Sequence, residues 1–302
     1  DARVTWTLRD GGGAVIGTAG PLPAGTTAEI VVPRPECWSP ASPSLYWAEV
    51  RLERDGTTVD EARVRFGITR AEFRPDEGFF LDGRRTELQG ANRHAEIPGL
   101  GSALPAELHR RDARILKDLG CNFVRLSHYP QSPAFLDACD ELGILVYAEL
   151  ATWKVMRSSA RFQRAAQRQL RSMVLRDRHH PSVILWGIGN ETRAREPFLA
   201  LSTLARELDP SRPVTYAENH LYRARRYRTL GIPDVWSVNY ELHELEAARD
   251  ASRLRAVILT ECCKHFTGVR GDDQEELAQV AAVESDWEAM AGRPFLAGHA
   301  VW

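Results

Sequence analysis

The chain has 302 residues, a formal net charge of −2, 43% hydrophobic residues and 26% charged residues. This composition is typical of a globular protein that is long enough for two domains. Because there is no excess of lysine and arginine to displace counterions, we expect no partner among nucleic acids or membrane surfaces. The longest apolar runs, such as VILWGIG, are far shorter than the ~20 residues that span a bilayer, so no transmembrane segment is predicted.

Alternating apolar and polar residues mark the first part of the chain, residues 1–72. The alternation runs over Val4–Leu8 and again over Tyr46–Leu52, as in strands with one buried face. Asp55 and Gly56 form a two-residue hairpin signal. Short strands separated by glycine and proline, without a helical period, predict a small β-sandwich.

The remainder, residues 73–302, alternates between strands and helices. The predicted strands are Glu87–Asn92, Asn122–Ser127, Ile144–Glu149, Ser182–Gly189, Val214–Glu218, Val235–Tyr240, Ala256–Glu261 and Pro294–Trp302. The predicted helices are Ala106–Leu119, Ser132–Leu142, Arg161–Asp177, Pro197–Leu208 and Gln274–Ala291. Eight strands with interleaved helices favour a (β/α)8 barrel, which usually takes ~250 residues. A doubly wound open sheet is the alternative, but no glycine-rich phosphate loop follows the first strand.

Two glutamates close apolar runs rich in β-branched residues: Glu191 ends ILWGIGNE and Glu261 ends AVILTE. Each could be a helix-capping or ion-paired residue, but an unpaired carboxylate on a buried strand is costly and needs a reason. Strands four and seven end on opposite sides of a barrel mouth. A pair of carboxylates there is typical of glycosidic bond hydrolysis. One attacks the anomeric carbon while the other protonates the leaving oxygen and later activates water, at a separation of ~5–5.5 Å for a retaining enzyme.

Other strand ends carry polar or aromatic residues that we expect at the same mouth: His94, Arg125, His128, Tyr240 and Trp302. An arginine inside a barrel is costly unless it pairs with a carboxylate, and Glu261 is the expected partner of Arg125. The pair would hold Glu261 ionised. A tyrosine at the sixth strand could hydrogen-bond the same carboxylate, and an indole at the eighth could stack on a sugar.

Several strings together resemble glycoside hydrolase family 2, the β-galactosidase and β-glucuronidase family. They are NRH (Asn92–His94), SHYP (Ser127–Pro130), CDELG (Cys139–Gly143), RDRHHPSVILWGIGNE (Arg176–Glu191) and the TE at the end of the seventh strand. WSPASPSLY (Trp38–Tyr46) and FGI (Phe66–Ile68) are similar to that family's immunoglobulin-like domain and its junction with the barrel. The resemblance implies a multidomain α/β fold, with an immunoglobulin-like β-sandwich over residues 1–72 and a catalytic (β/α)8 TIM barrel over residues 73–302.

The resemblance also implies a role for each site residue. Glu191 is expected to be the acid/base, Glu261 the nucleophile, Asn190 a ligand of the sugar 2-hydroxyl, His94 and His128 sugar contacts, Tyr240 an aid to the nucleophile, Arg125 its orienting cation, and Trp302 the lining of the sugar subsite. The implied enzyme is a retaining exo-β-glycosidase that hydrolyses terminal β-D-galactosides through a covalent glycosyl-enzyme. The alternatives are a β-glucuronidase or β-mannosidase of the same family, or a non-catalytic carbohydrate-binding barrel fragment.

The chain departs from the family pattern in two places that concern partners and metals. The family's N-terminal jelly-roll domain is not seen, and the chain looks like a fragment cut at both ends. The magnesium-binding glutamate and histidine that some β-galactosidases carry after the third strand are not seen either, because this segment reads ELATWKVM (Glu149–Met156). We therefore expect no metal and no cofactor, and a carbohydrate substrate, a β-glycoside, as the partner. The oligomeric state is left open, with a homo-oligomer among the alternatives.

The five cysteines bear on the compartment. Cys37, Cys121, Cys139, Cys262 and Cys263 fit neither a metal site nor a disulfide framework. The odd number and the adjacent pair favour reduced thiols, which predicts a cytoplasmic protein.

Overall fold

The computed structural model describes residues 2–154, 159–252, 255–264 and 273–302. The chain forms two compact units. The first comprises Asp1–Thr69 with His179–Pro181, and the second comprises Arg70–Arg178 with Ser182–Trp302. None of the helices in the described part of the chain is both long and apolar enough to cross a membrane.

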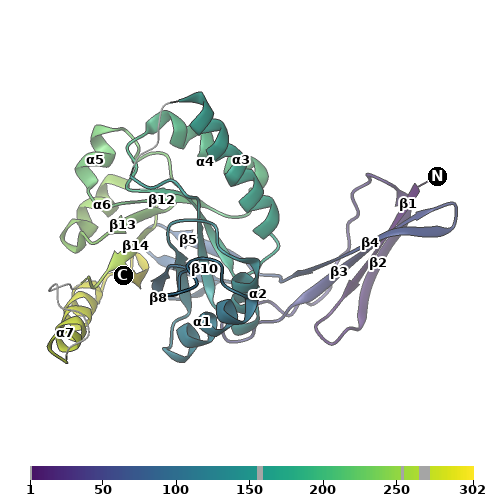
Figure 1. Ribbon diagram of the computed structural model, residues 1–302, viewed down its shortest axis with the longest axis horizontal. Coiled ribbons are helices and arrows are strands. Elements are labelled where there is room, and N and C mark those ends of the chain that lie inside the picture. Colours follow the sequence, from purple (N-terminus) through teal and green to yellow (C-terminus); the bar gives the residue numbers. More distant parts are fainter. Residues whose placement is uncertain (1, 155–158, 253–254, 265–272) are drawn as a thin grey trace. The chain divides into compact units, whose positions relative to one another are not determined.

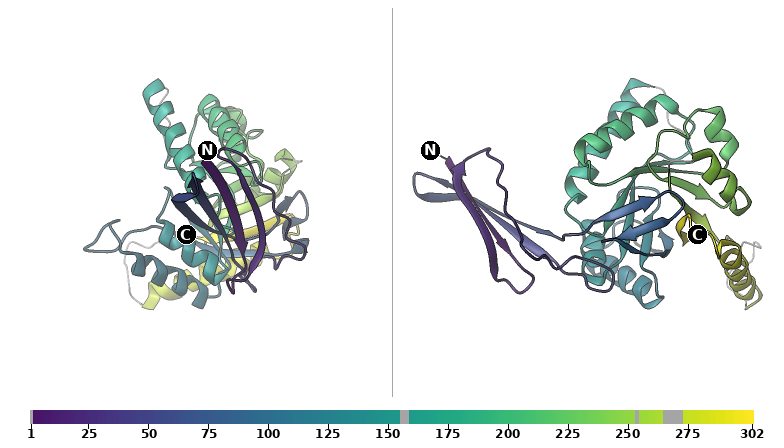
Figure 2. Two further views of the ribbon diagram at one scale, coloured as in Figure 1. Left: turned by 90° about the vertical axis from the view of Figure 1, so that its right-hand side faces the viewer. Right: turned by 180° about the vertical axis from the view of Figure 1, so that it is seen from behind.

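The first unit contains one antiparallel sheet of four strands in the order β2-β1-β3-β4 (Figure 1). Its strands are β1 (Ala2–Arg9), β2 (Val15–Pro23), β3 (Tyr46–Arg54) and β4 (Thr57–Phe66). The predicted hairpin turn joins β3 to β4, and both Asp55 (φ 51°) and Gly56 (φ 80°) are left-handed, as a type I′ turn requires. Figure 2 shows the same strands, coloured purple to blue, from two further sides.

The second unit is a closed barrel in which all eight strands are parallel, in the order β10-β11-β12-β13-β14-β15-β8-β9. Its strands are β8 (Leu88–Arg93), β9 (Phe123–Leu126), β10 (Leu145–Glu149), β11 (Val183–Asn190), β12 (Val214–Glu218), β13 (Trp236–Asn239), β14 (Val257–Cys262) and β15 (Leu296–Val301). Each predicted strand overlaps one of these, so the predicted barrel is confirmed.

Helices connect the barrel strands and cover the outside of the barrel (Figure 1). They are α1 (Ala106–Asp118), α2 (Pro133–Leu142), α3 (Ala160–Asp177), α4 (Arg195–Leu208), α5 (Leu221–Arg226), η1 (Leu242–Glu244), α6 (Leu245–Ser252) and α7 (Asp273–Met290). The sequence predicted five of them and missed α5, η1 and α6, which are too short to show a clear helical period. It also missed a small antiparallel sheet made of β5 (Ala71–Arg74), β6 (Gly78–Leu81) and β7 (Arg84–Arg85).

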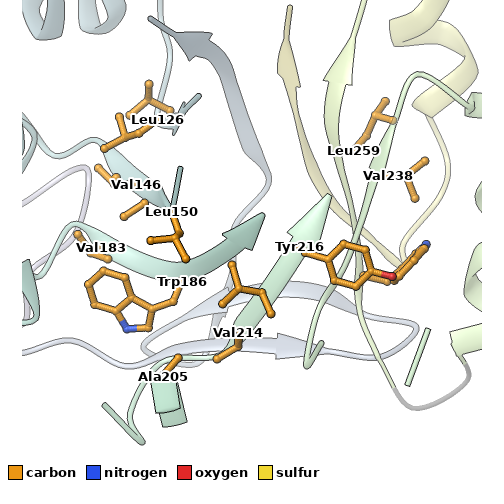
Figure 3. Packing of buried hydrophobic residues seen from close by; sticks show 14 of the residues in the cluster. Leu126, Val146, Leu150, Val183, Trp186, Ala205, Val214, Tyr216, Val238 and Leu259 are labelled. Atoms are coloured by element: carbon orange, nitrogen blue, oxygen red, sulfur yellow. The ribbon is translucent and has the colours of Figure 1, made fainter. Parts of the chain in front are cut away.

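The outward faces of the barrel strands form the hydrophobic core with the helices. Val146, Trp186, Tyr216 and Leu259 belong to one buried cluster, which Figure 3 shows from close by. Because side chains alternate along a strand, the residues that precede and follow each of these on its own strand point into the barrel. In β9, Val124 and Leu126 join the outer cluster, and Arg125 between them is fully buried inside.

Glycine makes room for the large side chains inside the barrel. A Cβ atom at Gly187 would lie 2.1 Å from the ring of Tyr147, which fills this space instead. The Tyr147 ring in turn lies under the Arg125 guanidinium, 5.3 Å from its centre. The interior is therefore a packed core that fixes Arg125 below the mouth.

Candidate active site

The two predicted catalytic glutamates lie at the carboxyl ends of two barrel strands. Glu261 is near the end of β14, and Glu191 directly follows β11. Both are buried, with 2% and 9% of the residue exposed. Glu191 has a φ of 46°, a left-handed conformation that costs a non-glycine residue about 1–3 kcal/mol. The alternative that Glu191 opens the next helix is wrong, because α4 begins at Arg195.

A single nitrogen atom, Asn239 Nδ2, contacts both carboxylates. It lies 3.2 Å from Glu191 Oε1 and 2.9 Å from Glu261 Oε1. Because both distances end on the same atom, the two oxygens are at most about 6.1 Å apart, the 3.2 Å and 2.9 Å laid end to end. The structure therefore brings the two glutamates to one place. Asn239 ends β13, at the sixth position in the barrel.

Arg125 is the cation of this site, and it is fully buried. Its Nη1 donates to Glu261 Oε1 at 2.7 Å, which is the predicted ion pair. Its Nη2 and Nε both lie 2.8 Å from Glu149 Oε2. Burial alone would lower the pKa of Arg125, but the charges of Glu149 and Glu261 outweigh burial and raise it above its ordinary value.

Glu149, which ends β10, is a member of the site that the sequence reasoning did not assign. It is fully buried, and its second oxygen, Oε1, lies 2.7 Å from His128 Nδ1. Burial would raise the pKa of this carboxyl, but Arg125 and His128 lower it below its usual range. Both of its oxygens are thus engaged by the protein itself. At the described barrel mouth, no three carboxylate, histidine or cysteine side chains bring ligand atoms within 4.8 Å of one another as a metal would require.

The amide of Asn190 has a fixed orientation. Its Oδ1 accepts hydrogen bonds from Arg125 Nη2 at 2.7 Å and from Asn239 Nδ2 at 3.0 Å. Because both nitrogens can only donate a hydrogen bond, the amide atom that they contact must be the oxygen of Asn190. The NH2 group of Asn190 is consequently the end that is left to donate to other groups.

Aromatic rings gather beside the carboxylates. The ring of His128 is nearly parallel to the rings of Trp302 and Trp153, with ring centres 5.4 Å and 6.4 Å away and interplanar angles of 22° and 15°. His94 meets Trp302 edge-on at 5.5 Å and His128 at 5.7 Å. Burial, followed by the nearby His128, lowers the pKa of His94. The structure therefore brings together the predicted residues His94, His128 and Trp302.

Tyr240 follows β13 and lies next to Glu261. It adopts a left-handed conformation with a φ of 64°, and its backbone N–H donates to the Glu261 carbonyl at 2.6 Å. Burial, followed by the nearby Glu261 carboxylate, raises the pKa of Tyr240 well above its ordinary value. Arg93, the residue before His94 in the NRH string, does not join these residues but pairs with Asp112 at 2.5 Å.

Glu218 is a further buried acid near the site. It ends β12, and it is 3% exposed. Its Oε1 accepts the N–H of Asn219 at 3.0 Å, and Arg223 Nη1 is 4.0 Å away. Burial raises the pKa of Glu218 to about 7, and the charge of Glu191 adds to the same effect.

Sequence reasoning missed Glu149, Asn239 and Trp153 as members of the site. Glu149 carried a usable signal, because ILVYAE ends an apolar run in a glutamate just as the strands of Glu191 and Glu261 do. Asn239 is likewise a polar residue at the end of a buried strand, β13. Trp153 had no such signal, because it lies beyond its strand in a connecting segment.

Comparison with known proteins gives the family. The model of "Glycosyl hydrolases family 2, TIM barrel domain" matches residues 74–265, and that of "Glycosyl hydrolases family 2" matches residues 3–68. A beta-galactosidase of Thermoanaerobacter pseudethanolicus is 34% identical over 248 residues, which are 81% of this chain and 32% of the relative. A putative beta-glucuronidase of Formosa agariphila is 34% identical over 219 residues, 68% of this chain and 26% of the relative. The chain thus spans about a third or less of these relatives.

Solved structures agree with this. The FMN-binding beta-glucuronidase from Facaelibacterium prausnitzii L2-6 has a TM-score of 0.89 and 29% identity, and covers 100% of this chain and 50% of its own. A Bacteroides uniformis beta-glucuronidase has a TM-score of 0.88 and 26% identity, and the match covers 100% of this chain and 41% of the glucuronidase. The predicted family is confirmed: this chain, an immunoglobulin-like sheet region followed by a TIM barrel, belongs to glycosyl hydrolase family 2 and is related to beta-galactosidases and beta-glucuronidases.

Proposed function

We propose that this chain carries the active site of a retaining exo-β-glycosidase that hydrolyses terminal β-D-galactosides. In the first step Glu261 attacks the anomeric carbon while Glu191 protonates the departing oxygen. In the second step Glu191 removes a proton from water, which releases the sugar from Glu261 with its original configuration.

The observation that carries this proposal is the nitrogen that contacts both carboxylates. It limits their nearest oxygens to about 6.1 Å. Retaining enzymes hold the two groups ~5–5.5 Å apart, whereas inverting enzymes need ~6.5–9.5 Å to admit a water molecule. The limit of about 6.1 Å on the distance between the two oxygens lies below the separation that inverting enzymes need, so it supports double displacement.

The surroundings of the two carboxylates support different roles. Glu261 receives hydrogen bonds from Arg125 Nη1 and Asn239 Nδ2, both of which stabilise a negative charge. Among the described residues, no lysine, arginine or histidine nitrogen lies within 4 Å of the Glu191 carboxylate, whose side-chain contact is the amide of Asn239. A carboxylate with strong donors suits a nucleophile, and one without a cation suits an acid that must carry a proton.

The remaining predicted residues fit a sugar subsite. The NH2 group of Asn190 is free to donate to a hydroxyl beside the anomeric carbon. His94 and His128 would contact other hydroxyls, and the Trp302 indole would lie along the C–H face of the ring. A structural neighbour, a Bacteroides uniformis beta-glucuronidase 2, is covalently bound to cyclophellitol-6-carboxylate aziridine, which is in keeping with a covalent route.

The choice of galactose rests on relatives. Two beta-galactosidases, 34% and 38% identical, favour it. The second candidate is a β-glucuronidase, which the names of the two solved structures above favour. The proposal also includes the cytoplasm as the compartment, because the odd number of cysteines and the adjacent Cys262 and Cys263 favour reduced thiols.

The decisive test is a panel of 4-nitrophenyl β-galactoside, β-glucuronide and β-mannoside, followed by NMR of the sugar as it is released. We expect turnover of the galactoside and a β-anomer as the first product. A first product of α configuration would overturn the retaining mechanism. No turnover of any of the three sugars, together with binding of a sugar lactone, would favour a non-catalytic carbohydrate-binding barrel.

A further inference from the structure

Trp153 is a large apolar side chain that is 54% exposed beside the candidate active site. Its backbone is tied to β11. It forms a parallel bridge with Asn190, the residue that precedes Glu191. Asn190 N donates to Thr152 O at 2.9 Å, and Lys154 N donates to Asn190 O at 2.9 Å. The indole is thus anchored to the strand that delivers the proposed acid/base.

Trp302 is anchored to the other catalytic strand. Its N–H donates to the carbonyl of Cys262 at 3.0 Å, and Cys262 directly follows Glu261. The rings of Trp153 and Trp302 lie nearly parallel to the ring of His128, at 15° and 22°. The backbone of Trp302 is therefore hydrogen-bonded to the strand of the nucleophile and that of Trp153 to the strand of the acid/base, and both rings contact His128.

The chemistry assigns different parts of the substrate to these two indoles. A nucleophile approaches the anomeric carbon of the sugar, whereas an acid must reach the oxygen that joins the sugar to its leaving group. The backbone attachments of the two residues accordingly favour Trp302 as the neighbour of the sugar and Trp153 as the neighbour of the leaving group. We propose that Trp153 is the stacking platform for the leaving group, and that the substrates are β-glycosides with an aromatic leaving group. This inference rests on the proposed function, because it needs Glu191 to be the acid.

The surroundings of the indole support this role. The ammonium of Lys154 lies 4.6 Å from the centre of the Trp153 ring, a cation–π distance. The lysine stem is flexible, so an arriving aromatic ring can take its place on this face. Stacking of two aromatic rings contributes about 0.5–1.5 kcal/mol beyond the area that they bury.

The experiment compares two substrates of the same sugar: the 4-methylumbelliferyl β-glycoside, whose leaving group is a large aromatic ring, and the β-glycosyl fluoride, whose leaving group is a single atom. The sugar is the one that the wild type turns over in the nitrophenyl panel. If the wild type turns over none of them, the proposed function fails before this inference is tested.

For Trp153→Ala we expect kcat/KM to fall about tenfold on the umbelliferyl substrate, mainly through KM, and to stay within about twofold on the fluoride. The unchanged fluoride rate also shows that the variant is folded. Trp153→Phe should recover most of the lost activity, because it keeps an aromatic face. Equal losses of kcat/KM on both substrates, or no loss on either, would show that Trp153 does not bind the leaving group.

Trp287→Ala is the matched control. Trp287 lies on α7, is 44% exposed, and packs edge-on against His299 at 5.0 Å. His299 is not among the residues of the proposed machinery. It should leave both rates unchanged. Trp302→Ala should reduce both rates together, since it removes a contact with the sugar. If Trp302→Ala instead impaired the umbelliferyl substrate selectively, the assignment of the two indoles would be wrong.

Discussion

Arg125 and Glu149 form an ion pair in which both side chains are completely excluded from solvent, with Nη2 and Oε2 2.8 Å apart. Desolvating two charges costs several kcal/mol each, so such a pair is retained only where its geometry and further hydrogen bonds compensate. Here His128 Nδ1 contacts the second oxygen of Glu149, and Glu261 also pairs with Arg125.

Glu149→Gln should destabilise the barrel by about 3 kcal/mol, because a buried arginine loses one of its two counter-charges. Urea unfolding at pH 7 measures this change. The matched control is Glu141→Gln, which removes a pair with Arg110 whose side chains are 40% and 37% exposed. It should change the free energy of unfolding by less than about 1 kcal/mol. Similar values for the two variants would mean that the buried pair contributes no more than a surface pair.

Glu261→Gln should lower turnover of an aryl β-glycoside by at least about a thousandfold, because an amide cannot form the covalent ester. Binding of substrate should persist, and single-turnover measurements should detect no burst of released phenol. Glu196→Gln, at an exposed glutamate on α4, should leave the rate unchanged. A residual rate within tenfold of the wild type would exclude Glu261 as the nucleophile.

Glu191→Ala should slow hydrolysis about 100- to 10,000-fold, because water then lacks its general base. Azide is a nucleophile that needs no base, so it should restore turnover of an activated aryl substrate and give the β-glycosyl azide. NMR identifies that product. The acid/base role of Glu191 would be refuted by the absence of any rescue, or by an azide of α configuration.

Glu218 should make the protein less stable as the pH rises. Its pKa is raised to about 7 in the folded chain, so between its ordinary value of 4.5 and 7 the folded state binds more protons than the unfolded state. The free energy of unfolding therefore falls over this window, by about 3 kcal/mol in all, because each tenfold difference in proton affinity between the two states corresponds to about 1.4 kcal/mol.

Glu218→Gln should remove this loss and be more stable than the wild type at pH 8, with no advantage at pH 4.5. Urea unfolding at both pH values measures the difference. Glu196→Gln, at an exposed carboxyl, should show no such dependence. A pH profile of Glu218→Gln that is parallel to that of the wild type would show that Glu218 does not titrate in this window.

The barrel could be read from the sequence because its strands are buried on both faces and appear as continuous apolar runs with a carboxylate or amide at the end. The Arg125–Glu261 pair was predictable for a related reason, since a buried arginine demands a partner. The second partner of Arg125, which is Glu149, was not predictable in this way. Whether Glu149 reaches Arg125 depends on strand order and register, here Tyr147 opposite Arg125, which no local pattern encodes.

The contact of Asn239 with both glutamates was beyond sequence reasoning as well. It needs β13 to lie between β12 and β14, and it needs the left-handed turn at Glu191 that redirects the carboxylate after its strand. The short helices α5 and α6 were missed because six and eight residues are too few to establish a period. The parts that were missed thus depend on closure of the barrel, and the parts that were found depend on burial of single strands.

The shared guanidinium of Arg125 has a consequence for the covalent intermediate. When Glu261 is esterified by the sugar, it loses its negative charge. An arginine paired with Glu261 alone would then be a buried cation without a counter-charge. Glu149 has no part in the proposed covalent chemistry, because it is fully buried and both of its oxygens contact Arg125 or His128. The permanent anion thus neutralises the cation in every state of the proposed cycle, and Glu261 can gain and lose its charge without leaving an uncompensated ion behind.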